Sequence, residues 1–470
     1  MSHRKASAAV ALSAALVIAA CTTPAGLQDP AITVPAAWNA VQISAPLALA
    51  DSAVVEQDWW RHFRDATLDA LVAEALANNK TLQIAKRRVD EARANRETAR
   101  AVLFPQINAT AGASRGNQGF LTQNRTFGIA QAGLEASWEA DLFGRNQALT
   151  AEASAVLQSE EATSQAVRVE LLAEVARDYF DLRNDERELI LTRANLQTQQ
   201  ETFELTKVQF QGGFASDFDV ERAGAQVSTT AALVPLLQAA YDAALNRLNI
   251  LLGTPPGTKD GLLKTSADLQ PLDQQVLIAA PASVLRARPD VRAAERQFAA
   301  TISAKQAATA QLFPDISLTA LFGLQGGSGF GAAPWNIGAG LVQPVLNFGR
   351  IESQIDAADA RQKQSFLTYQ QTVLQALENM EDAISSYARE TARNVSLAES
   401  VEQSRKASDL AQQQYTSGFT SLLDVLVAQR DLLNAQASQA ASDTDLRKDL
   451  VAIYTAAGGG WSDSISDNSR

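Results

Sequence analysis

The stretch Gly213-Phe-Ala-Ser-Asp-Phe-Asp-Val220 returns 205 residues later as Gly418-Phe-Thr-Ser-Leu-Leu-Asp-Val425. Two further stretches return in the same order along the chain. Leu103-Phe-Pro-Gln-Ile107 is repeated as Leu312-Phe-Pro-Asp-Ile316, and Leu142-Phe-Gly-Arg145 is repeated as Asn347-Phe-Gly-Arg350. Self-similarity that keeps its order indicates an internal repeat. The sequence therefore predicts a duplicated unit of roughly 205 residues.

Each copy contains a long segment without Gly or Pro just before the Gly-Phe stretch. These segments, 145–211 and 350–417, are rich in Ala, Leu, Gln, Glu and Arg, which favour helices. Apolar side chains recur with a seven-residue period at Val175, Leu182, Leu189, Leu196, Phe203 and Phe210, and again at Val373, Met380, Tyr387, Val401 and Tyr415. This period predicts coiled-coil packing of two very long helices, each roughly 100 Å in length.

Two other regions, one in each repeat, contain two stretches each that alternate apolar and polar side chains, as strands with two unlike faces do. Ile316 and Leu318, for example, alternate with Ser317 and Thr319. Strands of about ten residues with one apolar face are typical of a transmembrane β-barrel. Half-buried soluble hairpins are the alternative, but they favour Val, Thr and Tyr over the Gly and Ala found here. Four strands per chain cannot close a barrel, and hydrocarbon does not tolerate an open sheet edge. The sequence therefore predicts a cyclic oligomer that pools strands from several copies.

These features divide the chain into six parts. The first repeat, 66–252, is expected to contain a helix, strands at about 106–141, the long helix 145–211 and a return helix. The second repeat, 289–457, is expected to contain a helix, strands at about 315–347, the long helix 350–417 and a return helix. The other parts are an export signal at 1–20, an N-terminal extension at 21–65, a Pro-rich linker at 253–288 and a C-terminal tail at 458–470.

The first residues are typical of a secretory signal peptide. Arg4 and Lys5 precede a short apolar run that ends just before Cys21, and this run is too short to span a membrane. Residues 16–21, Leu-Val-Ile-Ala-Ala-Cys, resemble a bacterial lipobox, in which the cysteine becomes the lipid-modified first residue of the mature protein. A free cysteine beside an ordinary cleavage site is the alternative. We expect Cys21 to carry a covalent lipid.

The composition of the 470-residue chain excludes several classes of protein. With 40 Lys and Arg against 52 Asp and Glu the net charge is −12, which argues against a nucleic-acid partner. Two His and one Cys leave almost nothing for zinc or thiol chemistry, so no metal site is expected. Apart from the lipid on Cys21, no cofactor is predicted, and the protein is not expected to be an enzyme.

Several motifs resemble those of the outer membrane factor family, the TolC-like efflux ducts, and in particular its lipoprotein branch. The most specific motif is Arg288-Pro-Asp-Val-Arg-Ala-Ala-Glu-Arg-Gln297. The other matches are Trp59-Trp60 with Phe63, Asp65 and Leu68, the two Leu-Phe-Pro and the two Phe-Gly-Arg corners, and the final Gly458-Gly-Gly-Trp461. They are spread over nearly the whole mature chain.

This resemblance implies a mainly α-helical homotrimer in which four strands per subunit form a 12-stranded β-barrel in the outer membrane of a Gram-negative bacterium. A long α-helical barrel would continue the pore through the periplasm. An equatorial layer around its middle would consist of the N-terminal segment 21–65, the linker 253–288 and the C-terminal tail. The family docks onto a periplasmic adaptor protein and an inner-membrane pump, here expected to be of the RND type, and exports drugs or other small solutes. The chain would therefore be a passive duct, anchored in outer-membrane lipid.

The resemblance also implies an acidic aperture at the periplasmic end, where Asp219 and Asp424 match the acidic positions. A second interpretation comes from the residues themselves. Ser216 to Asp219 and Ser421 to Asp424 have the spacing of a capping box, so each aspartate could simply cap a helix. The two roles are compatible. Family members often carry a second acid one turn further on, where this chain has Val427.

Two further groups of residues are candidate contact sites. Gly212, Gly213 and Gly418 are expected in the tip turns that let the adaptor approach, with Phe214 and Phe419 as contacts. Trp138, Trp335, Arg145 and Arg350 are expected at the membrane interface, the tryptophans as girdle anchors.

Two other functions fit parts of the sequence. A periplasmic coiled-coil structural protein tethered by its lipid is the main alternative, since it needs only the long helices and Cys21. A lipid-anchored hydrolase that uses carboxylates is a weaker one, because the chain lacks strand–helix alternation. The glycine-rich run from Gly326 to Gly331 lacks a following Lys and is expected to be an exposed loop, not a phosphate site.

Overall fold

The computed structural model describes residues 33–39, 47–49, 57–117, 126–264, 272, 276–326 and 331–461. Described residues from Val34 onward belong to one compact unit. The expected export signal, Cys21, most of the glycine-rich run and the end of the C-terminal tail lie outside the described residues.

The first repeat consists of two helices, two strands and two further helices. Asp65 starts the first helix, because its carboxylate accepts hydrogen bonds from the amides of Thr67 and Leu68. The helical region before the strands is interrupted at Asn79, whose ψ of 130° ends one helix and whose side chain caps the next at the amide of Leu82. The elements are α2 (Ala66–Asn78), α3 (Lys80–Ala101), β2 (Gln106–Asn117), β3 (Thr126–Glu139), α4 (Arg145–Gln211) and α5 (Asp217–Leu251).

The second repeat has the same order with one helix before its strands. It contains α8 (Pro289–Ala310), β5 (Asp315–Gly326), β6 (Trp335–Val342), α9 (Arg350–Thr416) and α10 (Leu422–Ala456). The long helices α4 and α9 both have 67 residues. Each starts after a glycine with positive φ, Gly144 or Gly349, which turns the chain from the sheet into the helix.

The described segments outside the repeats contain only short elements. Strand β1 (Leu47–Leu49) pairs in parallel with β4 (Val276–Ile278). The other short elements are the 3-10 helix η3 (Trp59–Phe63), α6 (Asp260–Leu263) and α7 (Pro281–Ala287). Thus the extension before the first repeat and the linker between the repeats are joined by backbone hydrogen bonds.

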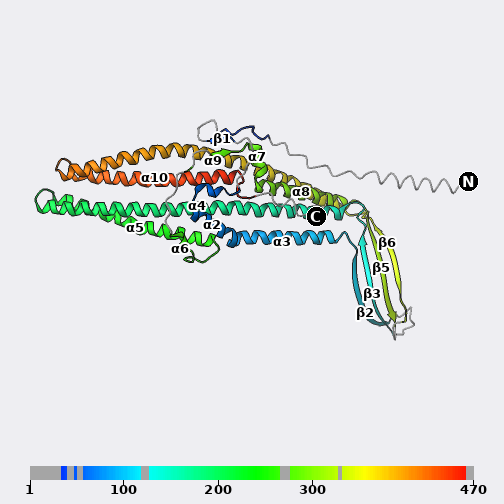
Figure 1. The fold of residues 1–470 in the computed structure, drawn as a ribbon. Coiled ribbons are helices and arrows are strands. Elements are labelled where there is room, and N and C mark those ends of the chain that lie inside the picture. The colour runs from blue at the N-terminus through cyan, green and yellow to red at the C-terminus, as the bar shows by residue number, and fades with distance from the viewer. Residues whose placement is uncertain are drawn as a thin grey trace. The chain divides into compact units, whose positions relative to one another are not determined.

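The four long strands form one antiparallel sheet in the order β2, β3, β5, β6 (Figure 1). The two repeats meet at the β3–β5 pair, where Leu134 lies opposite Phe322. Strands β2 and β6 are the two edges, and neither edge has a partner strand among the described residues. The sheet of the single chain is therefore open within the described residues.

The helices also pack side by side in a fixed order. Near the sheet the order is α3, α4, α8, α9, and further away it is α5, α4, α10, α9 (Figure 1). One lateral edge of this layer is consequently formed by α3 and α5, and the other by α9. Among the described residues, no helix has both the length and the apolarity needed to cross a bilayer.

The largest apolar core joins the middle of the long helices to η3. Trp59 is fully buried and stacks on Tyr454 of α10 with ring centroids 5.6 Å apart. Phe63 packs on Phe180 of α4 at 4.8 Å. The hydroxyl of Tyr179 donates a 2.5 Å hydrogen bond to the Asp65 carboxylate. This core fixes α4 and α10 to the extension that precedes the first repeat.

Candidate channel surfaces

The tip turn between α4 and α5 is built from small residues. Gly212 ends α4, and Gly213 adopts φ 77°, a left-handed conformation that favours glycine. The next residue, Phe214, is 89% exposed. The equivalent turn between α9 and α10 has Gly418 at φ 75° and Phe419 at 85% exposure. Both turns therefore present an aromatic ring to solvent in one protomer.

Asp219 and Asp424 both complete capping boxes directly after these turns. The Asp219 carboxylate accepts hydrogen bonds from the Ser216 amide at 3.1 Å and from the Ser216 hydroxyl at 2.6 Å. Asp424 accepts the same two bonds from Ser421 and a third from the Thr420 hydroxyl at 2.7 Å. The Ser421 hydroxyl, the Thr420 hydroxyl and the Ser421 amide lower the pKa of Asp424. The capping role expected from the spacing is therefore present in both helices.

A row of buried polar side chains, here called the seam, lies between the α4–α5 pair and the α9–α10 pair, on the sheet side of the tip turns. The Gln429 amide of α10 donates to the Thr202 hydroxyl of α4 at 3.0 Å. The hydroxyls of Thr206 and Tyr415 lie 3.2 Å apart. Gln429 and Thr206 are both buried, but the Oε1 atom of Gln429 has no hydrogen-bond partner among the described residues. The two helix pairs are thus joined by hydrogen bonds that water could replace.

One face of the sheet is apolar over most of its length in all four strands, and Arg115 interrupts it near the last residue of β2, Asn117. The strand register places Leu134 of β3 beside Ala109 of β2 and Phe322 of β5. The same face carries Ile107, Ala111, Ala113, Ala132, Ala136, Trp138, Leu318, Ala320, Leu324, Trp335, Ile337, Ala339 and Leu341. Its large side chains are exposed in the protomer, Ile337 by 78%. An exposed apolar face of this extent suits contact with lipid.

The other face of the sheet is polar and carries many small residues. Its central row contains Asn108, Glu135, Leu321 and Asn336, one from each strand. The neighbouring rows contain Gly133 with Gly323 on one side and Ser137, Thr319 and Gly338 on the other. A polar face opposite an apolar one is the arrangement of a membrane barrel with a wet interior.

The residues expected at the membrane interface lie at the sheet and at its junctions with the helices. Trp138 is partly exposed, and its indole donates to the carbonyl of Leu103 at 3.0 Å. Trp335 is 72% exposed at the start of β6. Arg145, the first residue of α4, lies 4.0 Å from both Glu139 and Asp315. Arg350 is exposed at the start of α9.

A family model described as outer membrane efflux protein matches residues 71–254 and 280–459, which include the second repeat and all of the first except its first five residues. The chain belongs to the outer membrane efflux protein family.

Individual relatives agree with this assignment. Nodulation protein T of Rhizobium leguminosarum bv. viciae is 33% identical over 407 residues, which cover 86% of this chain and 84% of the relative. The pyoverdine export outer membrane protein OpmQ of Pseudomonas aeruginosa is 30% identical over 469 residues, which cover 96% of each chain. The solved structure of the outer-membrane channel OprN has 34% identity and a TM-score of 0.85, covering 92% of this chain and 99% of that chain.

Membership in the outer membrane efflux protein family establishes the class of function. Proteins of this family are passive outer-membrane channels of Gram-negative efflux systems and not enzymes. The two sheet faces, the tip turns and the long helices are therefore parts of a conduit. Among the described residues, no group of three or more His, Cys, Asp or Glu side chains is arranged to hold a metal ion.

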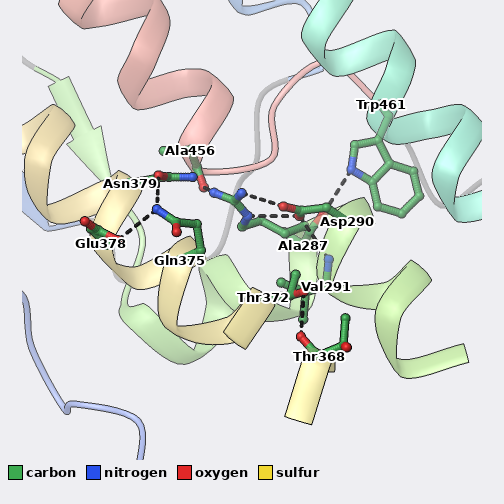
Figure 2. A network of polar contacts seen from close by, with 11 residues as sticks. Ala287, Asp290, Val291, Thr368, Thr372, Gln375, Glu378, Asn379, Ala456 and Trp461 are labelled. Atoms are coloured by element: carbon green, nitrogen blue, oxygen red, sulfur yellow. Dashed lines mark hydrogen bonds and ion pairs between the residues drawn. The ribbon is translucent and has the colours of Figure 1, made fainter. Parts of the chain in front are cut away.

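The Arg288 motif, which the sequence connects only to the family, has a structural role in this efflux protein. The Arg288 guanidinium donates to the Asp290 carboxylate at 2.6 and 3.0 Å and to the carbonyl of Ala456 at 3.0 Å. The Trp461 indole donates to the carbonyl of Ala287 at 3.0 Å (Figure 2). These bonds attach the linker and the start of α8 to the end of α10. No periodicity in the sequence predicts the bonds that involve Ala456 and Trp461, because their partners are far away along the chain.

Proposed function

We propose that the protein is a homotrimeric, lipid-anchored duct that conducts small solutes through the outer membrane after a periplasmic adaptor and an inner-membrane pump of the RND type deliver them. The observation that carries this proposal is the matching pair of open edges in one protomer. A monomer with such edges is incomplete as a membrane structure.

The sheet edges give the first part of the argument. β2 and β6 have unpaired outer sides within the described residues, and unpaired peptide groups in hydrocarbon cost several kcal/mol each. Pairing β6 of one copy with β2 of the next satisfies both edges. Three copies give twelve strands, which is within the range of natural membrane barrels.

The helix edges give the second part. The helix α3 leads directly into β2, and α9 directly follows β6, so each lateral edge of the helical layer continues a sheet edge. Both helical edges expose apolar side chains, including Leu233 and Leu236 on α5 and Leu367 and Leu374 on α9. A single rotation that joins the sheet edges would also cover these side chains. Such a head-to-tail contact closes into a ring.

The tip residues supply the contacts with the rest of the pump in this proposal. In a trimer, Asp219 and Asp424 would each form a ring of three carboxylates at the periplasmic aperture, in addition to capping their helices. Phe214 and Phe419 would contact the adaptor. The names of relatives mention pyoverdine export and nodulation. They favour small organic solutes as cargo.

The mass and the conductance of the purified mature protein test this function. We expect a trimer in detergent by light scattering, and discrete ion-conducting steps after insertion into a planar bilayer. A monomer without conductance would favour the tethered coiled-coil alternative instead. For the aperture, the Asp219→Ala and Asp424→Ala variants should weaken block by a multivalent cation added on the periplasmic side. Unchanged block would leave these residues with the capping role alone.

A further inference from the structure

The polar face of the sheet carries three carboxylates in its described strands, Glu135, Glu139 and Asp315, and Glu135 is the one without an ion pair to Arg145. We propose that Glu135 forms a second, membrane-embedded ring of three carboxylates inside the β-barrel, which favours cationic and zwitterionic solutes over anions. This inference rests on the proposed trimeric barrel, since one copy supplies only one carboxylate.

Glu135 lies in the half of β3 nearer the helices, four residues before the strand ends at Glu139. Its neighbours across the sheet are Asn108 and Leu321, and Asn336 completes the row. Within the described parts of the four strands, no Lys or Arg shares this face. The Glu135 charge therefore has no cation beside it on the wall of the pore.

The space around Glu135 is also kept open. On one side lie Gly133 and Gly323, where an added Cβ would stand only 2.8 and 2.9 Å from the backbone of the neighbouring strand. On the other side lie the short side chains of Ser137 and Thr319. Gln106, opposite Ser137, is the one long side chain in these two adjoining rows of the described strands. The Glu135 side chain is exposed and free to reach into the pore.

The other acids of this face are in a different situation. Glu139 and Asp315 lie at the helix end of the sheet, and both are 4.0 Å from the Arg145 guanidinium. That cation offsets part of their charge. Glu135 is thus the carboxylate whose field is least compensated, and a pore with low-dielectric walls concentrates such a field.

The proposed ring and the aperture act independently. The helix α4, with 67 residues, separates the sheet from the tip turn. At about 1.5 Å per residue this is roughly 100 Å, and the Debye length at physiological salt is only about 8 Å. A solute would therefore pass the two acidic rings one after the other, at opposite ends of the duct, and each ring would select for cations independently.

The test measures reversal potentials in a KCl gradient across a planar bilayer. The parent is the Asp219→Asn/Asp424→Asn variant, so that the aperture contributes no carboxylates. We expect this parent to remain cation-selective. Adding Glu135→Gln should lower the K⁺/Cl⁻ permeability ratio by at least about threefold, since a local potential of about one kT changes ion partition by this order.

A relocation variant supplies the control. Asn108 lies directly opposite Glu135, so Glu135→Gln/Asn108→Asp returns one carboxylate to the same row and should restore cation preference. A conducting trimer whose permeability ratio is unchanged by Glu135→Gln would overturn the inference while leaving the channel function intact. If the unmodified protein itself formed no trimer and conducted no ions, the proposed function would be rejected instead.

Discussion

Arg288 is the residue that holds the linker, α8 and α10 together. Its side chain is mostly buried, and its guanidinium donates two hydrogen bonds to the Asp290 carboxylate and one to the carbonyl of Ala456. Pro289 keeps the Arg288 backbone extended at ψ 123°, which directs the chain from α7 into α8. A planar guanidinium can satisfy both partners at once, whereas an ammonium group acts as a single point charge.

The Arg288→Lys variant should therefore be less stable than the parent. We expect a loss of about 1–2 kcal/mol in the free energy of unfolding, and about 3 kcal/mol for Arg288→Ala, because a buried carbonyl and a carboxylate lose their donor. Urea titration followed by tryptophan fluorescence measures both values. Arg296→Lys is the matched control, since Arg296 forms a half-exposed ion pair with its neighbour Glu295 at 3.5 Å. Equal midpoints for the two lysine variants would contradict this role.

Asp449 of α10 makes stability depend on pH. Burial raises its pKa to about 6 from an ordinary value of 3.8, with further increases from Glu390 and Asp445 and an opposing effect of Lys448. The unfolded chain releases this proton near pH 4, whereas the folded chain keeps it until about pH 6. Folded protein therefore binds more protons in that window, and stability falls as pH rises through it.

Replacing this carboxyl should remove the penalty at neutral pH. Two pKa units correspond to about 3 kcal/mol, and solvent screening at this half-buried position reduces the expected gain for Asp449→Asn to about 1 kcal/mol at pH 7.5. The gain should disappear below about pH 4, where the carboxyl is protonated in both states. Unfolding titrations at pH 4 and pH 7.5 measure the difference. A gain of equal size at both values would contradict the titration of Asp449 as its cause.

At the scale of elements, the seam between the two helix pairs is polar where an ordinary coiled coil is apolar. The buried Gln429 satisfies Thr202 but leaves its own Oε1 unpaired. Thr202 keeps a second bond, donated to the Thr198 carbonyl at 3.0 Å, when Gln429 is removed. Replacing Gln429 by an apolar side chain of similar volume therefore removes an unsatisfied oxygen and does not leave Thr202 without a hydrogen bond.

We accordingly expect Gln429→Leu to stabilise the seam by about 1 kcal/mol. Hydrogen exchange of the α4 amides between Thr198 and Thr206 should slow in this variant. Gln429→Glu is the matched control and should accelerate the same exchange, because it buries a carboxylate without a cation. Faster exchange in Gln429→Leu would show that the seam depends on the amide.

The elements differ in how far the sequence predicts them. The sequence predicts the long helices because 67 residues without Gly or Pro and a seven-residue period favour no other structure. The sequence does not predict the break at Asn79, because the break depends on one side chain that caps α3 and donates to the Leu251 carbonyl of α5. Likewise, alternation shows that Glu135 faces the polar side, but only the β3–β5 register shows that no cation stands beside it.

At the scale of the whole molecule, the apolar face of the sheet and the proposed lipid on Cys21 would be two separate attachments to the outer membrane. A single acyl chain contributes about 0.8 kcal/mol per buried methylene and gives reversible binding. The sheet exposes many large apolar side chains, among them Phe322 and Trp335. Burying such a face contributes about 25 cal/mol per Å², so the barrel should dominate attachment.

Removing the lipid distinguishes a spanning barrel from a tethered coiled coil. The Cys21→Ala variant, given an ordinary cleavable export signal so that processing does not depend on the cysteine, should stay in the membrane pellet after carbonate washing. It should also remain a trimer, because the proposed subunit contacts are formed by strand and helix edges that do not include residue 21. A lipid-modified periplasmic protein with the same substitution is the control, and it should appear in the wash. Release of the variant with that control would mean that the sheet is not inserted, and the apolar face would then need a protein partner instead of lipid.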